Sequence, residues 1–274
     1  MLAMTDAVLA VILGIVEGLT EFLPVSSTGH MILVMPWLGI PDDDRFWNDV
    51  FNFFIQSGAI LAVVIFFWRR LWRLTFRPPG SAWHAHILVK LFVAMLPAAI
   101  LGPLLDDFMK TRLMTPSVVA GALVAGGLAI LAIERWGGRP RLPDAGTIPL
   151  HIVLAIGLIQ CLAMVPGTSR SGATIMGALL LGLTPAAAAE FSFFLAIPTL
   201  LGASALSLVK GLGKIQPGQH AVLAVGFVVS FLVAWLVVKM FMRYIQTHRF
   251  TAFAVYRIVL GVVVAVLLVF DSFG

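Results

Sequence analysis

The sequence predicts an all-α, polytopic integral membrane protein with inverted-topology repeats, six spanning helices and two re-entrant helical hairpins. Hydrophobic residues make up 60% of the 274 residues and charged residues only 11%, with a mean hydropathy of +1.03, whereas a soluble domain carries about 25% charged residues. Apolar runs of about 20 residues, the length that crosses a bilayer as a helix, recur along the chain. Two further apolar stretches are interrupted by proline, glycine, serine and charge.

The continuous apolar runs account for the six spanning helices. Each is close to the length that a bilayer requires. The single cysteine, Cys161, cannot form an intramolecular disulfide and is expected to pack within an apolar segment. The predicted spans are Val50–Trp68, His86–Leu105, Pro116–Glu134, Ala189–Leu208, Ala221–Met240 and Ala252–Phe270.

Basic residues gather in three short connections between these runs. The connections lie at residues 69–77, 135–141 and 239–249. The net charge of +5 could suggest a nucleic-acid partner, but retention of basic loops on the cytoplasmic side explains this placement better. We therefore expect no nucleic-acid binding, both termini on the outer side, and one membrane domain over residues 1–274.

The two interrupted stretches are Thr5–Trp37 and Leu150–Leu183. Broken helices of this kind are tolerated at membrane depth only where protein or a water-filled cavity covers the backbone, so we interpret both as re-entrant hairpins. Each is followed by three spans. Three is an odd number, so the second half would be inserted upside down relative to the first, as in inverted repeats whose broken helices meet at a site.

The predicted repeats cover residues 1–141 and 142–274. Two short motifs support this division by recurring in both halves. The paired motifs are Gly14-Ile-Val-Glu17 with Gly157-Leu-Ile-Gln160, and Pro24-Val-Ser-Ser27 with Pro166-Gly-Thr-Ser169.

The first interrupted stretch contains two carboxylates, Glu17 and Glu21, which share one face of a helix because of their i,i+4 spacing. Ionisable residues inside a membrane are costly and indicate function. Two like charges on one face also predict a cation, a shared proton or a polar ligand between them. The alternative is that the pair caps or solvates a helix end near the interface.

The polar run that follows is suited to an anion. Pro24 is expected to end the helix. Ser26, Ser27 and Thr28 then offer hydroxyl and backbone N–H groups, and a helix that begins there would favour phosphate at its N-terminus. Simple N-capping is the alternative role for these three residues. His30 can titrate near neutrality and is a candidate acid–base group.

The second interrupted stretch contains Arg170 between serine and glycine residues. A guanidinium group is always charged and binds phosphate in a bidentate manner. A salt bridge to Glu17 or Glu21 is the alternative, and both roles can hold in resting and bound states. The neighbouring candidates for substrate binding are Thr168, Ser169, Ser171 and Gly172.

Four further polar residues lie in or near the spans. Gln56 and Glu190 either face the same cavity or serve helix packing. Tyr256 and Arg257, near the start of the last span, are interpreted as anchors at the membrane interface.

At these motifs the sequence closely resembles the bacterial undecaprenyl-diphosphate phosphatase family, also called bacitracin-resistance proteins. The resemblance covers nearly the whole chain, and its motifs are intact. They are Glu17-Gly-Leu-Thr-Glu21, Pro24-Val-Ser-Ser-Thr-Gly-His30, Gln56-Ser-Gly-Ala-Ile, Pro166-Gly-Thr-Ser-Arg-Ser-Gly172 and Glu190-Phe-Ser-Phe-Phe-Leu-Ala-Ile-Pro198.

The resemblance implies hydrolysis of the C55 isoprenoid diphosphate to its monophosphate, which recycles the carrier for peptidoglycan synthesis and confers bacitracin resistance. It also implies location in the bacterial inner membrane, a site open to the periplasmic side, and stimulation by a divalent cation, Mg²⁺ or Ca²⁺. The lipid diphosphate and the bilayer are then the partners of the chain. The oligomeric state is not fixed by the sequence, and a homodimer is one candidate.

On this basis Ser27 is expected to attack the terminal phosphorus, with His30 as proton donor or acceptor and Arg170 stabilising the phosphoryl charge. Glu17 and Glu21 would hold the cation, or Glu21 would act as the base. Attack by a metal-activated water, with Ser27 as a hydrogen-bond donor, stays open as the alternative. The remaining candidates for substrate binding are Ser26, Thr28, Thr168, Ser169, Ser171, Gly172 and Gln56.

A lipid-phosphate flippase or secondary transporter is the rival class, because such proteins also use inverted repeats and broken helices. The set of serine, histidine, glutamate and arginine favours the enzyme, since transport of an anion needs neither a nucleophile nor an acid–base pair.

Overall fold

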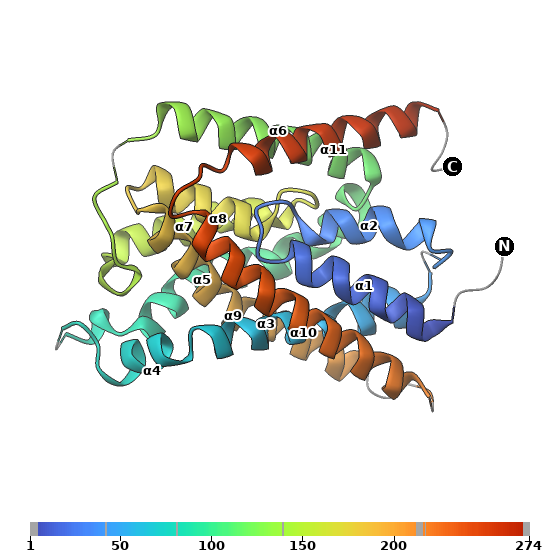
Figure 1. Cartoon of the computed structure of the whole chain (residues 1–274), viewed down its shortest axis with the longest axis horizontal. Helices are drawn as coiled ribbons and strands as arrows, with labels where there is room; N and C mark the ends of the chain where they lie inside the picture. The colour runs from blue at the N-terminus through green and yellow to red at the C-terminus, as the bar shows by residue number, and fades with distance from the viewer. Residues whose placement is uncertain are drawn as a thin grey trace.

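The computed structural model describes residues 5–41, 43–80, 82–138, 140–211, 216 and 218–270. Over these ranges the protein is a helical bundle in which no strand forms (Figure 1), apart from one isolated bridge between Leu142 and Leu183. Arg139, in the second basic connection, lies outside the described residues.

Each half of the chain contains two short helices and then three long ones. The helices of the first half are α1 (Asp6–Thr20), α2 (Ser27–Trp37), the π-helical η1 (Phe46–Phe51), α3 (Asn52–Phe66), α4 (Trp68–Phe76), η2 (Trp83–Ala85), α5 (Ile87–Phe108), η3 (Met109–Leu113) and α6 (Pro116–Trp136). Those of the second half are η4 (Ala145–Thr147), α7 (Leu150–Gln160), η5 (Cys161–Met164), α8 (Arg170–Leu180), α9 (Pro185–Gly211), α10 (Gln219–Tyr244) and α11 (Thr251–Val269).

Within the described residues, six helical segments are long and apolar enough to cross a membrane, which confirms the predicted number of spans. The first begins earlier than predicted because the π-helical turn of η1 runs directly into α3. The segments are Phe46–Phe66, Ile87–Leu105, Pro116–Trp136, Pro185–Gly202, Gln219–Tyr244 and Thr251–Val269.

The two interrupted stretches fold as hairpins of two short helices, as the sequence predicts. Helix α1 has 15 residues, and α2, α7 and α8 have 11 each. At 1.5 Å per residue even α1 spans only about 22 Å, which is less than the ~30 Å hydrocarbon core. None of these four helices can therefore cross a bilayer alone. In each stretch the two short helices pack against each other, so the chain turns at the break.

The two breaks are built in the same way around a serine with a positive φ. Ser26 caps α2, Ser169 caps α8, and φ is 74° at both residues. Ser26 lies as far after Gly14 as Ser169 lies after Gly157. The predicted pairing of Pro24 with Pro166 is therefore wrong by one residue, because the two prolines lie at different places in otherwise equivalent turns. With the two capping serines aligned, Ser27 of the first half corresponds to Arg170 of the second.

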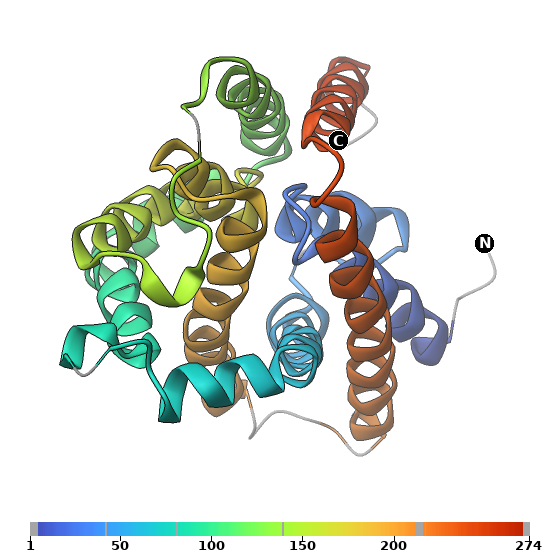
Figure 2. The same ribbon diagram turned by 60° about the vertical axis from the view of Figure 1, so that its left-hand side comes forward.

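The long helices hold the hairpins from both sides. Helix α1 packs along α10, α7 packs along α5, and α3 lies between α9 and α10. Helices α6 and α11 pack against each other along one side of the bundle, at the top of Figures 1 and 2. The interior contains an aromatic cluster around Phe193, which contacts Phe22, Phe67 and Phe241.

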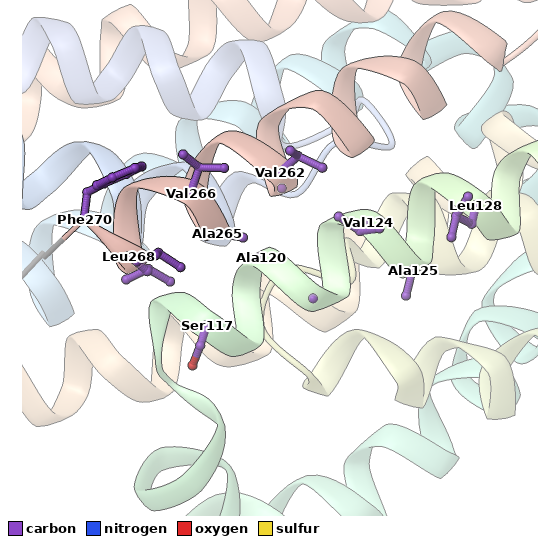
Figure 3. Close-up of a pocket in the computed structure, with 13 residues that line it drawn as sticks. Ser117, Ala120, Val124, Ala125, Leu128, Val262, Ala265, Val266, Leu268 and Phe270 are labelled. Atoms are coloured by element: carbon purple, nitrogen blue, oxygen red, sulfur yellow. The ribbon is translucent and has the colours of Figure 1, made fainter. Parts of the chain in front are cut away.

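A groove of about 810 Å³ runs between α6 and α11 (Figure 3). Its lining is almost entirely apolar, with Ala125 and Leu128 on α6 and Val262 and Ala265 on α11. It contains none of the residues that the sequence singles out for chemistry.

A cluster of charges joins the two halves at the basic end of the bundle. Arg70 of α4 forms an ion pair with Glu190 of α9 at 2.9 Å and another with Asp144. Burial alone would lower the pKa of Arg70, but its bonds to the two carboxylates outweigh burial and raise that pKa above its ordinary value. Lys90, buried on α5, donates to the carbonyl of Gly146 beside this cluster. Glu190 therefore serves helix packing.

We predict that Arg70→Ala destabilises the protein, because it leaves Glu190 without its cation. The loss of hydrogen bonds to charged groups costs about 1.5–3 kcal/mol each. Thermal unfolding in detergent measures the effect, with the exposed neighbour changed in Arg69→Ala as the matched control. Equal melting temperatures for the two variants would contradict a stabilising role for the cluster.

Candidate active site

The two hairpins meet at their breaks, and both α2 and α8 begin there. Ser171 of α8 donates its hydroxyl proton to the carbonyl of Leu23 at 2.7 Å, which ties the second break to the first. The first N–H groups of a helix have no partner within that helix, and they carry partial positive charge. Two helix N-termini from different halves of the chain therefore contribute to one site, where they favour an anion.

Glu21 links the predicted nucleophile to the predicted phosphate-binding arginine. The Ser27 hydroxyl donates to one carboxylate oxygen of Glu21. The other oxygen accepts a hydrogen bond from Nη2 of Arg170 at 2.8 Å. Arg170 also donates from Nη1 to the carbonyl of Ser192 at 3.1 Å, while its Nε is buried and has no partner among the described residues. The guanidinium is thus held in place and still has free N–H groups for a ligand.

Glu17 lies one helical turn before Glu21 and is only 1% exposed. Neither of its carboxylate oxygens accepts a hydrogen bond from an N–H or O–H group among the described residues, and its nearest polar neighbour is the carboxylate of Glu21, which lies within hydrogen-bonding reach. A buried carboxylate without a partner is costly unless it binds a proton or a cation. No group of three or more potential metal ligands occurs in the described part of the chain. Glu17 and Glu21 therefore fit a cation whose remaining ligands come from water or from a bound phosphate.

His30 is held by two hydrogen bonds. Its Nδ1 lies 2.7 Å from the carbonyl of Ser26, and its Nε2 lies 2.6 Å from the hydroxyl of Tyr256. A carbonyl can only accept, so Nδ1 carries the proton and Nε2 accepts from Tyr256. The two rings also stack at 5.7 Å. Neither ring nitrogen bonds to Ser27, so a role of His30 at that hydroxyl would need a water or a substrate group between them.

Ser26 has the capping role that was the alternative to substrate binding, and Ser169 caps its helix in the same way. Each serine accepts a hydrogen bond from the third residue of its helix, Gly29 at 3.2 Å and Gly172 at 3.0 Å. Such caps satisfy backbone N–H groups that a helix start leaves free. Each serine therefore supports the start of the helix that follows its break.

The other predicted residues lie at different depths. Thr28 is exposed, and Thr168 gives its carbonyl to Arg257. Ser171 is buried, and its hydroxyl lies 3.0 Å from that of Ser169. Gln56 on α3 has a buried side-chain oxygen with no hydrogen-bond partner in the described residues.

The interpretation of Arg257 as an interface anchor is wrong. Its side chain is 1% exposed and donates only to backbone carbonyls, three of which belong to the hairpin breaks. Tyr256 is partly exposed but binds His30. Arg257 lies nearly two turns inside α11, which is deeper than an anchor at a helix end. The distance of Arg257 from the start of the apolar run was the feature of the sequence that indicated a buried role.

The chain matches one family model and several curated relatives. The family model of the bacitracin resistance protein BacA matches residues 10–263. An undecaprenyl-diphosphatase of Rhodopseudomonas palustris (strain BisB18) is 45% identical over 258 residues, which cover 94% of this chain and 96% of the relative. An undecaprenyl-diphosphatase of Polaromonas naphthalenivorans (strain CJ2) is 45% identical over 263 residues, which cover 93% of this chain and 92% of the relative. Undecaprenyl-diphosphatase 1 of Mesorhizobium japonicum is 43% identical over 255 residues, which cover 93% of this chain and 94% of the relative.

We predict that Arg170→Ala is strongly destabilising, since it leaves the buried Glu21 charge without its cation. Removing one partner of a buried ion pair costs about 3–5 kcal/mol. The double variant Arg170→Ala/Glu21→Gln should recover part of that loss, because no unpaired charge is left. Denaturant unfolding in detergent compares the two. A double variant no more stable than Arg170→Ala would show that the pair does not account for the loss.

Proposed function

Because the chain belongs to the family of the bacitracin resistance protein BacA, we propose that it hydrolyses undecaprenyl diphosphate to undecaprenyl phosphate and inorganic phosphate where its two hairpins meet. The observation that carries this proposal is the link from Ser27 through Glu21 to Arg170, buried between two helix N-termini. The reaction returns the lipid carrier to peptidoglycan synthesis and confers bacitracin resistance.

Ser27 is the proposed nucleophile and Glu21 its base. Glu21 already accepts a hydrogen bond from the Ser27 hydroxyl, so transfer of the proton along this bond leaves an alkoxide that attacks the terminal phosphorus. The new Ser27 O–P bond forms as the bridging P–O bond breaks, and undecaprenyl phosphate departs. Water then hydrolyses the phosphoserine, which releases phosphate and restores the hydroxyl. A water nucleophile, with Ser27 as a hydrogen-bond donor, is the alternative.

Arg170 is the proposed phosphoryl-binding group. Its free N–H groups can bind equatorial oxygens of the terminal phosphate, where charge accumulates in the transition state. The bond to Glu21 then belongs to the resting state, and an incoming phosphate competes for the same guanidinium. His30, one turn after Ser27 on α2, is the proposed proton donor or acceptor for the departing or attacking oxygen.

Glu17 and Glu21 are the proposed ligands of a divalent cation, Mg²⁺ or Ca²⁺. The buried oxygens of Glu17, which have no partner within the described chain, support this assignment. Such a cation would neutralise charge on the diphosphate. The chain's own contribution is to hold both carboxylates at the break, where the diphosphate would arrive.

The proposed location is the bacterial inner membrane, with the site open to the periplasmic side. The placement of basic residues supports a cytoplasmic position for the three basic connections, whereas the periplasmic opening is what the family resemblance implies. The homodimer stays a prediction, and cross-linking in native membranes would test it.

The first test measures phosphate release from undecaprenyl diphosphate by the detergent-purified protein. Ser27→Ala should abolish trapping of a phosphoserine and lower kcat by about 10³-fold or more, and Arg170→Ala should lower it by a similar factor. Ser117→Ala, which changes an exposed serine on α6, is the control and should keep wild-type activity. No release by folded wild-type protein would contradict hydrolysis. Near-normal activity of Ser27→Ala would exclude Ser27 as the nucleophile.

The second test concerns the cation. Activity should be lost in EDTA and return on addition of Mg²⁺ or Ca²⁺, and Glu17→Gln should raise the required cation concentration about tenfold or more, since a charged ligand is lost. Calorimetric titration of Ca²⁺ into protein without substrate gives a readout independent of activity. Unchanged Ca²⁺ affinity in Glu17→Gln would remove Glu17 from the ligand set.

A further inference from the structure

We propose that Arg257 is a positioning residue that holds the two hairpin breaks in register, and that the Ser27–Glu21–Arg170 arrangement depends on it. The inference rests on the proposed function for its effect on activity. Its structural part can be tested without any substrate.

Arg257 reaches both breaks from α11 and also binds α6. Its Nη1 donates to the carbonyls of Pro24, in the first break, at 3.0 Å and Thr168, in the second, at 2.9 Å. Nη2 donates to the second break again at Gly167, at 3.0 Å, and to Ala122 of α6 at 3.1 Å. Nε donates to Leu123, also on α6, at 3.4 Å. One side chain therefore connects three segments that are far apart in the sequence.

These contacts use all five N–H groups of the guanidinium, one for each carbonyl. Arg257 thus has no free donor for a phosphate, whereas Arg170 has an Nε that no described residue binds and a bond to Glu21 that can be exchanged. The two arginines have different roles: Arg170 can bind the substrate, and Arg257 fixes the backbone around it.

The carbonyls that Arg257 binds lie close to the reacting groups along the chain. Pro24 is three residues before Ser27, and Thr168 is two residues before Arg170. A shift of either carbonyl would move the start of the adjacent helix and the functional side chain on it. Tyr256, the neighbour of Arg257, holds His30. The same turn of α11 therefore orients functional residues of both α2 and α8.

Gly126 on α6 makes room for this guanidinium. A Cβ atom added there would lie 2.0 Å from Nη2 and 2.6 Å from Cζ of Arg257, so an alanine must displace the group. Gly121 lies on the same helix, and a Cβ added there would meet nothing within 4 Å. The pair gives a matched test, because Gly126→Ala disturbs Arg257 without removing it and Gly121→Ala makes the same chemical change elsewhere.

The test compares Gly126→Ala, Gly121→Ala and Arg257→Lys in phosphate release. Gly126→Ala and Arg257→Lys should each lower kcat by about 10²-fold, the effect expected for a displacement near 1 Å. KM should change less than threefold, because Arg257 does not bind phosphate. The double variant Gly126→Ala/Arg257→Lys should have a kcat no lower than that of the less active single variant, since both substitutions act on one contact. Gly121→Ala should resemble the wild type.

Hydrogen–deuterium exchange of the two breaks, measured without substrate, separates this inference from the proposed function. Faster exchange of both breaks in Gly126→Ala and Arg257→Lys, with Gly121→Ala unchanged, would support positioning even if the wild type released no phosphate. Wild-type kcat and wild-type exchange in folded Gly126→Ala would overturn it. An increase confined to KM would also overturn it, because Arg257 would then act as a phosphate ligand.

Discussion

The structure depends on which groups donate hydrogen bonds to the backbone carbonyls that are left without partners where helices break inside the membrane. Hydrocarbon offers no hydrogen-bond donors, so a broken helix is stable only if protein groups replace those it loses. At the two breaks the replacements come from Arg257, which donates to three of these carbonyls, and from Ser171, which donates to Leu23. Ser26 and Ser169 satisfy N–H groups on the other side of each break. Side chains thus replace part of the backbone hydrogen bonding that each break loses.

The same breaks create the chemistry of the site. A helix that starts within the membrane exposes N–H groups, and two such starts face each other because Arg257 and Ser171 join the hairpins. Glu21 and Arg170 neutralise each other there. A diphosphate that takes Arg170 from Glu21 would free this carboxylate to hold the Ser27 proton. Substrate binding and activation of the nucleophile would then be coupled through one carboxylate.

The sequence predicted the spans and hairpins because both depend on local properties, namely apolar length and the position of proline, glycine and charge. It also predicted the link between Arg170 and Glu21 as one of two open roles. It could not predict the partners of Arg257, since Pro24 and Arg257 are 233 positions apart and a lone arginine carries no sign of which carbonyls it binds. The register of the two breaks was missed by one residue, because the prolines are more conspicuous than the serines that cap the helices.

The two buried arginines show why charge alone does not identify a ligand site. Arg170 pairs with a carboxylate, and its Nε has no partner among the described residues, so a phosphate can bind this donor or exchange with Glu21. Arg257 has five carbonyl partners, and any anion that bound it would leave at least one of these carbonyls without a donor, at about 1–3 kcal/mol each. The positive charge of Arg257 still acts on the site through a medium of low dielectric constant. It therefore favours an anion between the hairpins while its own position stays fixed.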